Sequence, residues 1–179
     1  QWCLCYHKPA VQWVQALPIG NGYMGAMIFG GVAAERIQFN EDTLWTGHPL
    51  DYQNPGAAEV LPELRRLLFE GKQGEAEQLA MERFMSNPLN QCAFQPFGDL
   101  NLVFEDHDAS SDYARRLDLN TAIADIAYVA GGVCYSREVF ASYPDRIIVV
   151  RLSADEPAAL TFKASLTSPH KESEQVVIA

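Results

Sequence analysis

The chain has 179 residues, of which 48% are hydrophobic and 11% aromatic, a composition typical of one well-packed globular domain. Thirteen Lys and Arg residues against twenty-three Asp and Glu residues give a formal net charge of −10. Such a field repels nucleic acid and anionic membranes, so we exclude both as partners. The sequence ends on the apolar run QVVIA without a turn signal, and we therefore expect the chain to be part of a longer protein.

The four cysteines do not form a metal motif. Their positions are Cys3, Cys5, Cys92 and Cys134, with no CxxC spacing and no histidine close to a pair. Cys3 and Cys5 would share one face of a strand and could not easily pair with each other. We expect the thiols to be mostly buried, and we expect neither a metal nor a cofactor. The cysteines do not decide between a cytoplasmic and a secreted location.

The first part of the chain predicts short strands separated by turns. Leu4–Val14 reads as an edge strand or extended segment, and Pro18 marks a break before a tight turn at Ile19–Gly22. Tyr23–Phe29 is apolar, and Glu35–Asn40 alternates polar and apolar residues with the period of a half-buried strand. These two runs predict a hairpin.

Two helices follow, inserted at about residues 57–86. In Ala57–Glu70 the apolar residues have helical spacing, with Asn54-Pro55 as a start signal and Gly71 as a stop. These apolar residues are Leu61, Leu64, Leu67 and Leu68. The second helix is predicted over Gly74–Met85.

The rest of the chain predicts a series of strands. Gly131-Gly132 is a hairpin signal, and Ile147–Val150 is an apolar run suited to a buried strand. Regular spacing of short strands favours an antiparallel sandwich, so the predicted fold class is mainly β with an inserted helical pair. The predicted strands are Leu100–Phe104, Tyr113–Leu119, Ala122–Val129, Val133–Ala141, Arg146–Leu152 and Leu160–Leu166.

The candidate functional residues are Asn40, Glu41, Asp42 and Trp45. Two carboxylates that act across a glycosidic bond must aim at one site, which adjacent residues manage only in a loop. Glu41 and Asp42 are therefore either site residues or part of a turn, in which Asp42 and Thr43 serve as caps. Trp45 with its polar neighbours is the mixture that stacks on a sugar ring. It could equally anchor the loop to a core or another domain.

Other polar residues are given structural roles. The four histidines, His7, His48, His107 and His170, are scattered and are expected to be surface or capping residues. Arg115 and Arg116 would point to opposite faces of a strand, and a salt bridge is their expected role.

Several segments together resemble the N-terminal domain of glycoside hydrolase family 95, typified by inverting α-L-fucosidases. They are LCYHKPA, ALPIGNGYMGAMIFGG, ERIQFNEDTLWTG, LPELRRLLFEGKQGEAEQLA, QPFGDLNLVF, DYARRLDLNTAIADIAY, YSREVFASYPDRIIVVRLSAD and LTSPH. The resemblance covers nearly the whole chain. It departs at Cys5, where an aromatic residue is more usual.

The resemblance implies a β super-sandwich that packs against an (α/α)6 barrel carrying the catalytic residues. No barrel motif has a counterpart here, so we expect residues 1–179 to be a non-catalytic N-terminal domain, and some strands of the sandwich to be absent. The implied partners are the C-terminal catalytic barrel and, through the whole enzyme, a fucosylated glycan. Asn40, Glu41, Asp42 and Trp45 would then be interface or substrate-rim residues. A free-standing carbohydrate-binding module and a purely structural domain remain the alternatives.

Overall fold

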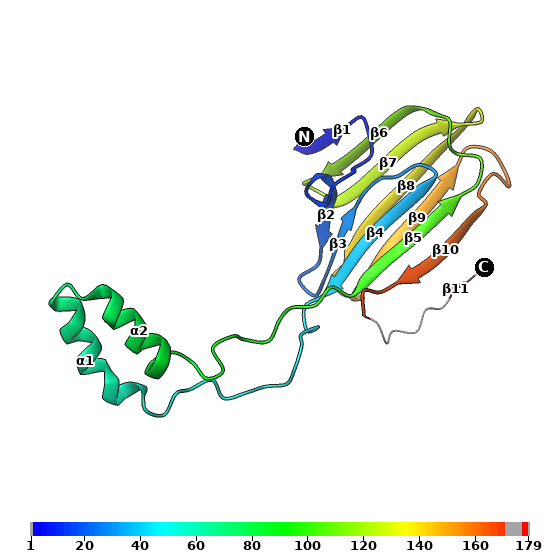
Figure 1. Cartoon of the computed structure of the whole chain (residues 1–179). Coiled ribbons are helices and arrows are strands. Elements are labelled where there is room, and N and C mark those ends of the chain that lie inside the picture. The colour runs from blue at the N-terminus through cyan, green and yellow to red at the C-terminus, as the bar shows by residue number, and fades with distance from the viewer. Residues whose placement is uncertain (1, 171–176, 179) are drawn as a thin grey trace. The chain divides into compact units, whose positions relative to one another are not determined.

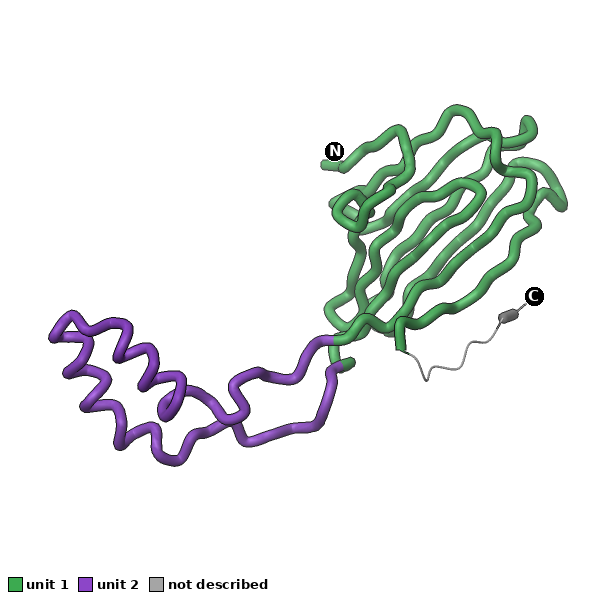
Figure 2. The backbone as a smooth tube through the Cα atoms, viewed as in Figure 1, with its two compact units in different colours: residues 1–44, 95–179 green, residues 45–94 purple. Residues whose placement is uncertain are grey.

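The computed structural model describes residues 2–170 and 177–178 of the chain. Two compact units are present, one formed by residues 1–44 with 95–179 and the other by residues 45–94 (Figure 2). The first unit is built from strands, and the second contains the helices α1 and α2 (Figure 1). The predicted fold class, mainly β with an inserted helical pair, is confirmed.

Two antiparallel sheets form the first unit (Figure 1). Among the described residues, one sheet has the order β1-β6-β7-β8-β9 and the other β11-β10-β5-β4-β3-β2. The first comprises Cys3–Tyr6 (β1), Ser110–Asp118 (β6), Ile123–Ala130 (β7), Val133–Ser142 (β8) and Ile147–Ala154 (β9). The second comprises Leu17–Gly20 (β2), Met24–Ile28 (β3), Ala34–Glu41 (β4), Gly98–Phe104 (β5), Phe162–Thr167 (β10) and Val177–Ile178 (β11).

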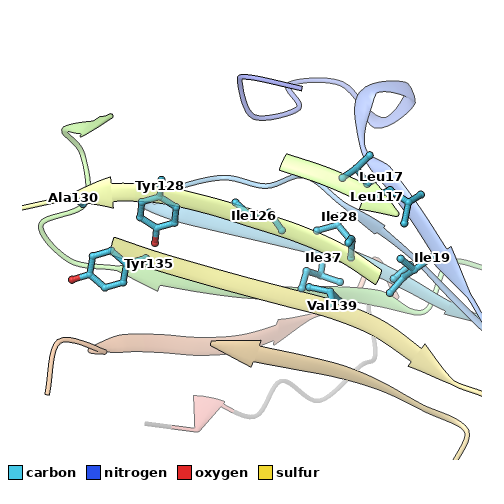
Figure 3. Packing of buried hydrophobic residues seen from close by; sticks show 12 residues of the cluster. Leu17, Ile19, Ile28, Ile37, Leu117, Ile126, Tyr128, Ala130, Tyr135 and Val139 are labelled. Carbon is cyan, nitrogen blue, oxygen red and sulfur yellow. The ribbon is translucent and has the colours of Figure 1, made fainter. Parts of the chain in front are cut away.

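An apolar core lies between the two sheets (Figure 3). Side chains alternate along each strand, so every second residue faces inward. On β7 these are Ala124, Ile126, Tyr128 and Ala130, and on the other sheet Leu17, Ile28 and Ile37 are buried to a similar degree. Face-to-face packing of two antiparallel sheets is the predicted sandwich.

Strand β2 contains Pro18, the residue at which the sequence predicts a break. Pro18 lies within β2, whose one partner strand in the described part of the chain is β3, at the edge of the sheet. An edge strand tolerates proline because one of its sides makes no ladder hydrogen bonds. The turn predicted at Ile19–Gly22 therefore starts later, where the N–H of Asn21 donates to the carbonyl of Met24 at 3.0 Å.

The predicted N-terminal strand Leu4–Val14 is shorter than expected. Within the described part of this segment the paired strand is β1, which lies beside β6 at the edge of the sheet. Residues Trp13–Gln15 instead form a 3-10 turn. The Oε1 atom of Gln15 accepts hydrogen bonds from the N–H groups of Val11 and Gln12 at 2.9 and 3.1 Å, which favours the turn over further extension.

A buried charge network spans the two sheets. Arg137 on β8 pairs with Glu35 on β4 and also donates to the carbonyls of Gly31 and Val32. Its Nη2 atom donates to the Tyr128 hydroxyl at 2.8 Å. Both Nη atoms of Arg137 and both carboxylate oxygens of Glu35 have partners, and no buried side-chain nitrogen or oxygen of the described residues is left without one.

The second unit is a pair of helices with a small core of its own. Helix α1 (Ala57–Phe69) and helix α2 (Gln73–Arg83) pack through buried Val60, Leu64, Leu67 and Ala76. Leu68 was predicted on this face but is 57% exposed, and Val60 lies there instead. Helix α1 begins at Ala57 as predicted, and Asn54, just before it, accepts a hydrogen bond from the Gly56 N–H.

The ends of the 45–94 segment meet at the sandwich. Strands β4 and β5 are antiparallel neighbours, and the segment is inserted between them in the sequence. The N–H of Gln95 donates to the carbonyl of Leu44 at 2.9 Å. The insertion is therefore a very long hairpin loop between two paired strands.

Two burial predictions, the buried thiols and the buried Ile147, were wrong, each for a reason of strand position. Cys3, Cys5 and Cys134 are exposed, because β1 is an edge strand open on both faces and Cys134 lies on the outer face of β8. The sulfurs of Cys3 and Cys5 lie 3.1 Å apart as free thiols, closer than expected. Ile147 is 47% exposed because β9 is the edge of its sheet.

Two further polar residues differ from their expected roles. His107 is buried rather than superficial, because aromatic rings of both sheets surround it. Arg115 is buried and donates to the carbonyls of Lys8 and Gln15 instead of forming a salt bridge. Arg116, on the opposite face, pairs with Asp125 at 3.1 Å as predicted.

Candidate functional site

Three of the four predicted site residues lie at one end of the sandwich, where β4 terminates. Asn40 and Glu41 are the last residues of β4, and Asp42 begins the turn that follows. The N–H of Asp42 donates to the carbonyl of Tyr23 at 2.9 Å, which ties this turn to the start of β3. The Oδ1 atom of Asn40 accepts a hydrogen bond from the Glu41 N–H, so Asn40 is engaged with its own backbone.

The carboxyl groups of Glu41 and Asp42 interact with each other. Hydrogen bonds from the Thr43 hydroxyl (2.6 Å) and N–H (3.0 Å) lower the pKa of Glu41. A hydrogen bond with Glu41 raises the pKa of Asp42. The Oε2 atom of Glu41 is already occupied by both hydrogen bonds from Thr43. The arrangement thus matches the turn interpretation, with Glu41 rather than Asp42 as the residue that binds Thr43.

Asn21 fixes the neighbouring β2–β3 turn. Its Oδ1 atom accepts hydrogen bonds from the N–H groups of Tyr23 and Met24 at 2.9 and 2.7 Å. Its Nδ2 atom donates to the carbonyl of Ser142 at 2.6 Å, at the end of β8. One side chain therefore joins loops from both sheets and holds Tyr23 in place.

Two residues of the β8–β9 turn complete the surface. The guanidinium of Arg146 lies 4.3 Å from the ring centroid of Tyr23, and the Tyr143 ring lies 5.6 Å from the same ring. The charge of Arg146 also lowers the pKa of both Glu41 and Asp42, as a smaller contribution than their hydrogen bonds. We refer to Tyr23, Glu41, Asp42, Tyr143 and Arg146 as the turn cluster.

An apolar cavity adjoins the turn cluster. Its volume is about 280 Å³, and it shares Arg146 with the cluster. The wall comes from both sheets, with Phe39 and Leu166 on one side and Ile147 and Val150 on the other. This end of the sandwich therefore presents aromatic, charged and apolar groups together.

Trp45, the fourth predicted residue, belongs to the other unit. It forms an isolated antiparallel bridge with Phe94, and the two ring centroids are 5.1 Å apart. The N–H of Thr46 donates to the carbonyl of Ala93 at 2.9 Å, so the two arms of the insertion are joined here. Trp45 is 52% exposed, which leaves much of its ring accessible.

Sequence reasoning did not find Tyr23, Tyr143 or Arg146 as site residues. Tyr143-Pro-Asp-Arg146 is recognisable as a turn between strands, but its partner lies more than a hundred residues earlier. Only the sandwich topology brings the three loops together. In the part of the chain that is described, no group of three His, Cys, Asp or Glu residues could hold a metal ion. No described helix is long and apolar enough to cross a membrane.

Comparison with known proteins identifies the family. Residues 4–179 match the family described as glycosyl hydrolase family 65, N-terminal domain. The chain belongs to this family. It is 43% identical over 175 residues to a protein named alpha-L-fucosidase 2 from Arabidopsis thaliana, a match that covers 96% of this chain and 20% of that protein.

Two fungal relatives show the same pattern of coverage. Proteins named probable alpha-fucosidase A from Aspergillus oryzae and Aspergillus niger are 30% and 31% identical to this chain. The matches cover 78% and 86% of this chain and 20% of each fungal protein. The chain therefore spans about a fifth of the length of the curated relatives it matches.

Proposed function

We propose that this chain is the non-catalytic N-terminal domain of an α-L-fucosidase-like glycoside hydrolase of the family 95 type. In this proposal it braces a C-terminal (α/α)6 catalytic domain of the same protein. The turn cluster and Trp45, at the base of the insertion, are the residues that we assign to contacts with that domain or with the rim of its sugar site. Hydrolysis in the whole enzyme proceeds with a general acid and an activated water, on residues outside this chain.

The observation that carries the proposal is the pattern of coverage. Relatives named as fucosidases match almost the whole of this chain with one fifth of their own length. A matching segment that is also a separate compact β-sandwich is what one domain of a multidomain enzyme looks like.

The surface at the end of the sandwich supports the bracing role. Aromatic residues and arginine are enriched in protein interfaces, where they surround an apolar centre. Tyr143 and Ile147 are 63% and 47% exposed beside the apolar cavity. We assign the catalytic domain of the same protein as the occupant of this surface, because the relatives have four fifths of their length outside the match.

The main alternative is a free-standing carbohydrate-binding module. The exposed Trp45 ring favours it, because such modules bind sugars on exposed aromatic platforms. In that case fuco-oligosaccharides would bind the isolated chain saturably, and Trp45→Ala would abolish the binding. Under the bracing proposal, binding through Trp45 is weak or absent without the catalytic domain.

The decisive experiment measures activity and assembly separately. The chain alone, incubated with an aryl α-L-fucoside, is expected to show no hydrolysis; turnover by the purified chain would overturn the proposal. The chain and the downstream region of the same protein are then produced separately and mixed. We expect them to associate and the downstream region to gain stability.

A charged substitution beside the apolar cavity tests whether the chain and the downstream region associate through this surface. Ile147→Asp is expected to weaken association at least about tenfold, since a buried unpaired charge opposes interface formation. Leu119→Asp is the matched control, because Leu119 is similarly exposed at 54% and does not line the cavity. Equal association of both variants would exclude this surface as the interface.

A further inference from the structure

A second cavity lies at the other end of β8 from the turn cluster. Its volume is about 320 Å³, at the small end of the range of about 300–1,000 Å³ for small-molecule sites. It is lined by three loops and the adjoining ends of β7 and β8, with no residue of the turn cluster. The polar lining groups are Glu105, Asp106, His107, Tyr135 and Thr161.

Stacked rings make one wall of this cavity rigid. The ring of His107 lies 4.3 Å from that of Tyr135 and 5.3 Å from that of Phe104, measured between centroids. Tyr135 in turn stacks on Tyr128 at 5.4 Å, and both side chains are seen in Figure 3 near the end of β7. His107 is only 6% exposed, so it is held within the sandwich rather than on its surface.

The hydrogen-bond network determines which nitrogen of His107 carries the proton. Arg137 can only donate, so the Tyr128 oxygen is an acceptor in their 2.8 Å bond. Tyr128 is buried, and among the described residues the Nδ1 atom of His107, at 3.0 Å, is the acceptor available to its hydroxyl proton. Neutral His107 therefore carries its proton on Nε2.

The Nε2–H group opens into the cavity. No bond of this atom to another described residue is present, yet no buried side-chain nitrogen or oxygen of the described residues lacks a partner. Nε2 is therefore accessible, and the cavity that His107 lines is the space it reaches. A donor on a nearly buried, fixed ring is a preorganised contact for a ligand.

The carboxylates of the lining decide the ligand's charge. Asp106 and Glu105 are acceptors that line the same cavity as His107, and Glu105 is partly neutralised by Lys163 at 2.7 Å. Asp106 and Glu105 would repel an anion. The Nε2–H dipole and the nearby Arg137 charge would repel a cation. A hydroxyl group donates to a carboxylate and accepts from an N–H, so several neighbouring hydroxyls satisfy the whole set.

We propose that this cavity binds one neutral sugar ring, through hydroxyl groups held by Asp106 and His107. The site is independent of the proposed domain role and performs no chemistry. It makes this domain a secondary carbohydrate contact, separate from any sugar site at the turn cluster. The ring bound is either a free monosaccharide or the end of a glycan, both of which offer the same hydroxyls.

The test follows the side-chain nitrogens of His107 by NMR in the ¹⁵N-labelled chain. The probes are the methyl glycosides of D-galactose, D-glucose and L-fucose, an oligosaccharide ending in the best of them, and methylammonium and acetate as charged probes. We expect saturable shifts of the His107 Nε2–H signal with a dissociation constant of about 1–10 mM, typical of few contacts. The oligosaccharide binds more tightly than the glycoside if a glycan end is the natural ligand.

Two matched variants separate binding from folding. Asp106→Asn removes the charged acceptor, and asparagine tolerates the positive φ of 63° at this position. Asp112→Asn is the control, since Asp112 also has a positive φ (54°) and does not line the cavity. Asp106→Asn is expected to weaken sugar binding about tenfold, the effect of losing a hydrogen bond to a charged group.

Three outcomes would overturn the proposal. One is the absence of any saturable His107 shift with all sugars at about 100 mM, well above the expected dissociation constant. Another is equal weakening by Asp106→Asn and Asp112→Asn. The third is tighter binding of methylammonium or acetate than of the glycosides, which would identify an ion site instead.

Discussion

The Nη1 atom of Arg137 lies 3.1 Å from the Oε2 atom of Glu35, and their side chains are 2% and 1% exposed. Glu35 also accepts hydrogen bonds from the Gly30 and Arg36 N–H groups at 2.8 and 3.0 Å. Arg137 stacks on the Phe104 ring with its guanidinium carbon 4.2 Å from the centroid. The pair therefore connects the β3–β4 turn of one sheet to β8 of the other.

Removal of one partner of this pair should destabilise the sandwich strongly. Glu35→Ala leaves the Arg137 charge buried without its counter-ion, which costs about 3–5 kcal/mol of the free energy of unfolding. Chemical denaturation monitored by fluorescence measures the change. The control is Glu138→Ala, which breaks the exposed Arg151 pair and should cost less than about 1 kcal/mol. Similar losses in both variants would contradict the role given to the buried pair.

Neutralisation of Arg146 should change the titration of the turn cluster. Its charge lowers the pKa of both Glu41 and Asp42, so Arg146→Gln is expected to raise both pKa values. Carboxyl ¹³C shifts followed against pH give the two values. Arg151→Gln is the control, because Arg151 is an exposed arginine of the following strand β9 that pairs with Glu138 instead. No upward change in Arg146→Gln would mean that the cluster does not form in solution.

His107 should make the stability of the chain depend on pH. Burial, and next the charge of Arg137, lowers the pKa of His107 from its ordinary 6.5. The unfolded chain then binds a proton below pH 6.5 that the folded chain does not, so stability is full above this pH. It decreases as the pH falls through 6.5 towards the lower folded pKa.

A single substitution isolates this contribution. His107→Gln removes the titrating group, while the Gln oxygen can still accept the Tyr128 hydroxyl proton. Between about pH 7.5 and about pH 5, a range that brackets the ordinary histidine pKa, the free energy of unfolding should fall more for the wild type than for the variant. Parallel curves for the two proteins would refute the pKa direction.

Two glycines of the helical unit should respond oppositely to alanine. Gly71 ends helix α1 with φ of 74°, where a side chain is strained although no atom lies within 4 Å of the added Cβ. Gly71→Ala is expected to destabilise the unit by about 1 kcal/mol. Gly74 lies inside helix α2 with open space around it, and Gly74→Ala should stabilise it by about 0.5–1 kcal/mol. Ellipticity at 222 nm during thermal unfolding reports both changes.

Local hydrophobic patterns were sufficient to predict those strands and helices whose structure depends on residues close in the sequence. The alternation of β4 and β7 and the leucine spacing of helix α1 predicted these elements to within two residues. The edge strands were less predictable, because Pro18 and the exposed apolar residue Ile147 make sense only at a sheet edge. Edge position depends on the order of strands, which a local pattern does not contain.

The candidate site was predictable only in part for the same reason. Asn40, Glu41 and Asp42 are consecutive, so the sequence already placed them together. The ring and the charge that complete the cluster, Tyr23 and Arg146, come from loops far apart in the chain. Glu35 fell on the apolar face of its strand in the pattern, but its partner Arg137 follows 102 residues later. The burial of Glu35 could be predicted only if its partner Arg137 were known.

The backbone hydrogen bond between Gln95 and Leu44 closes the junction between the sandwich and the inserted segment. Because β4 and β5 already pair across the junction, the sheet register does not depend on what the loop contains. Loop-closure entropy grows only slowly with length, so this position tolerates exchange of the whole 45–94 segment. A protein that must adapt its contacts to a neighbouring domain can remodel or replace this segment while the sandwich keeps its architecture.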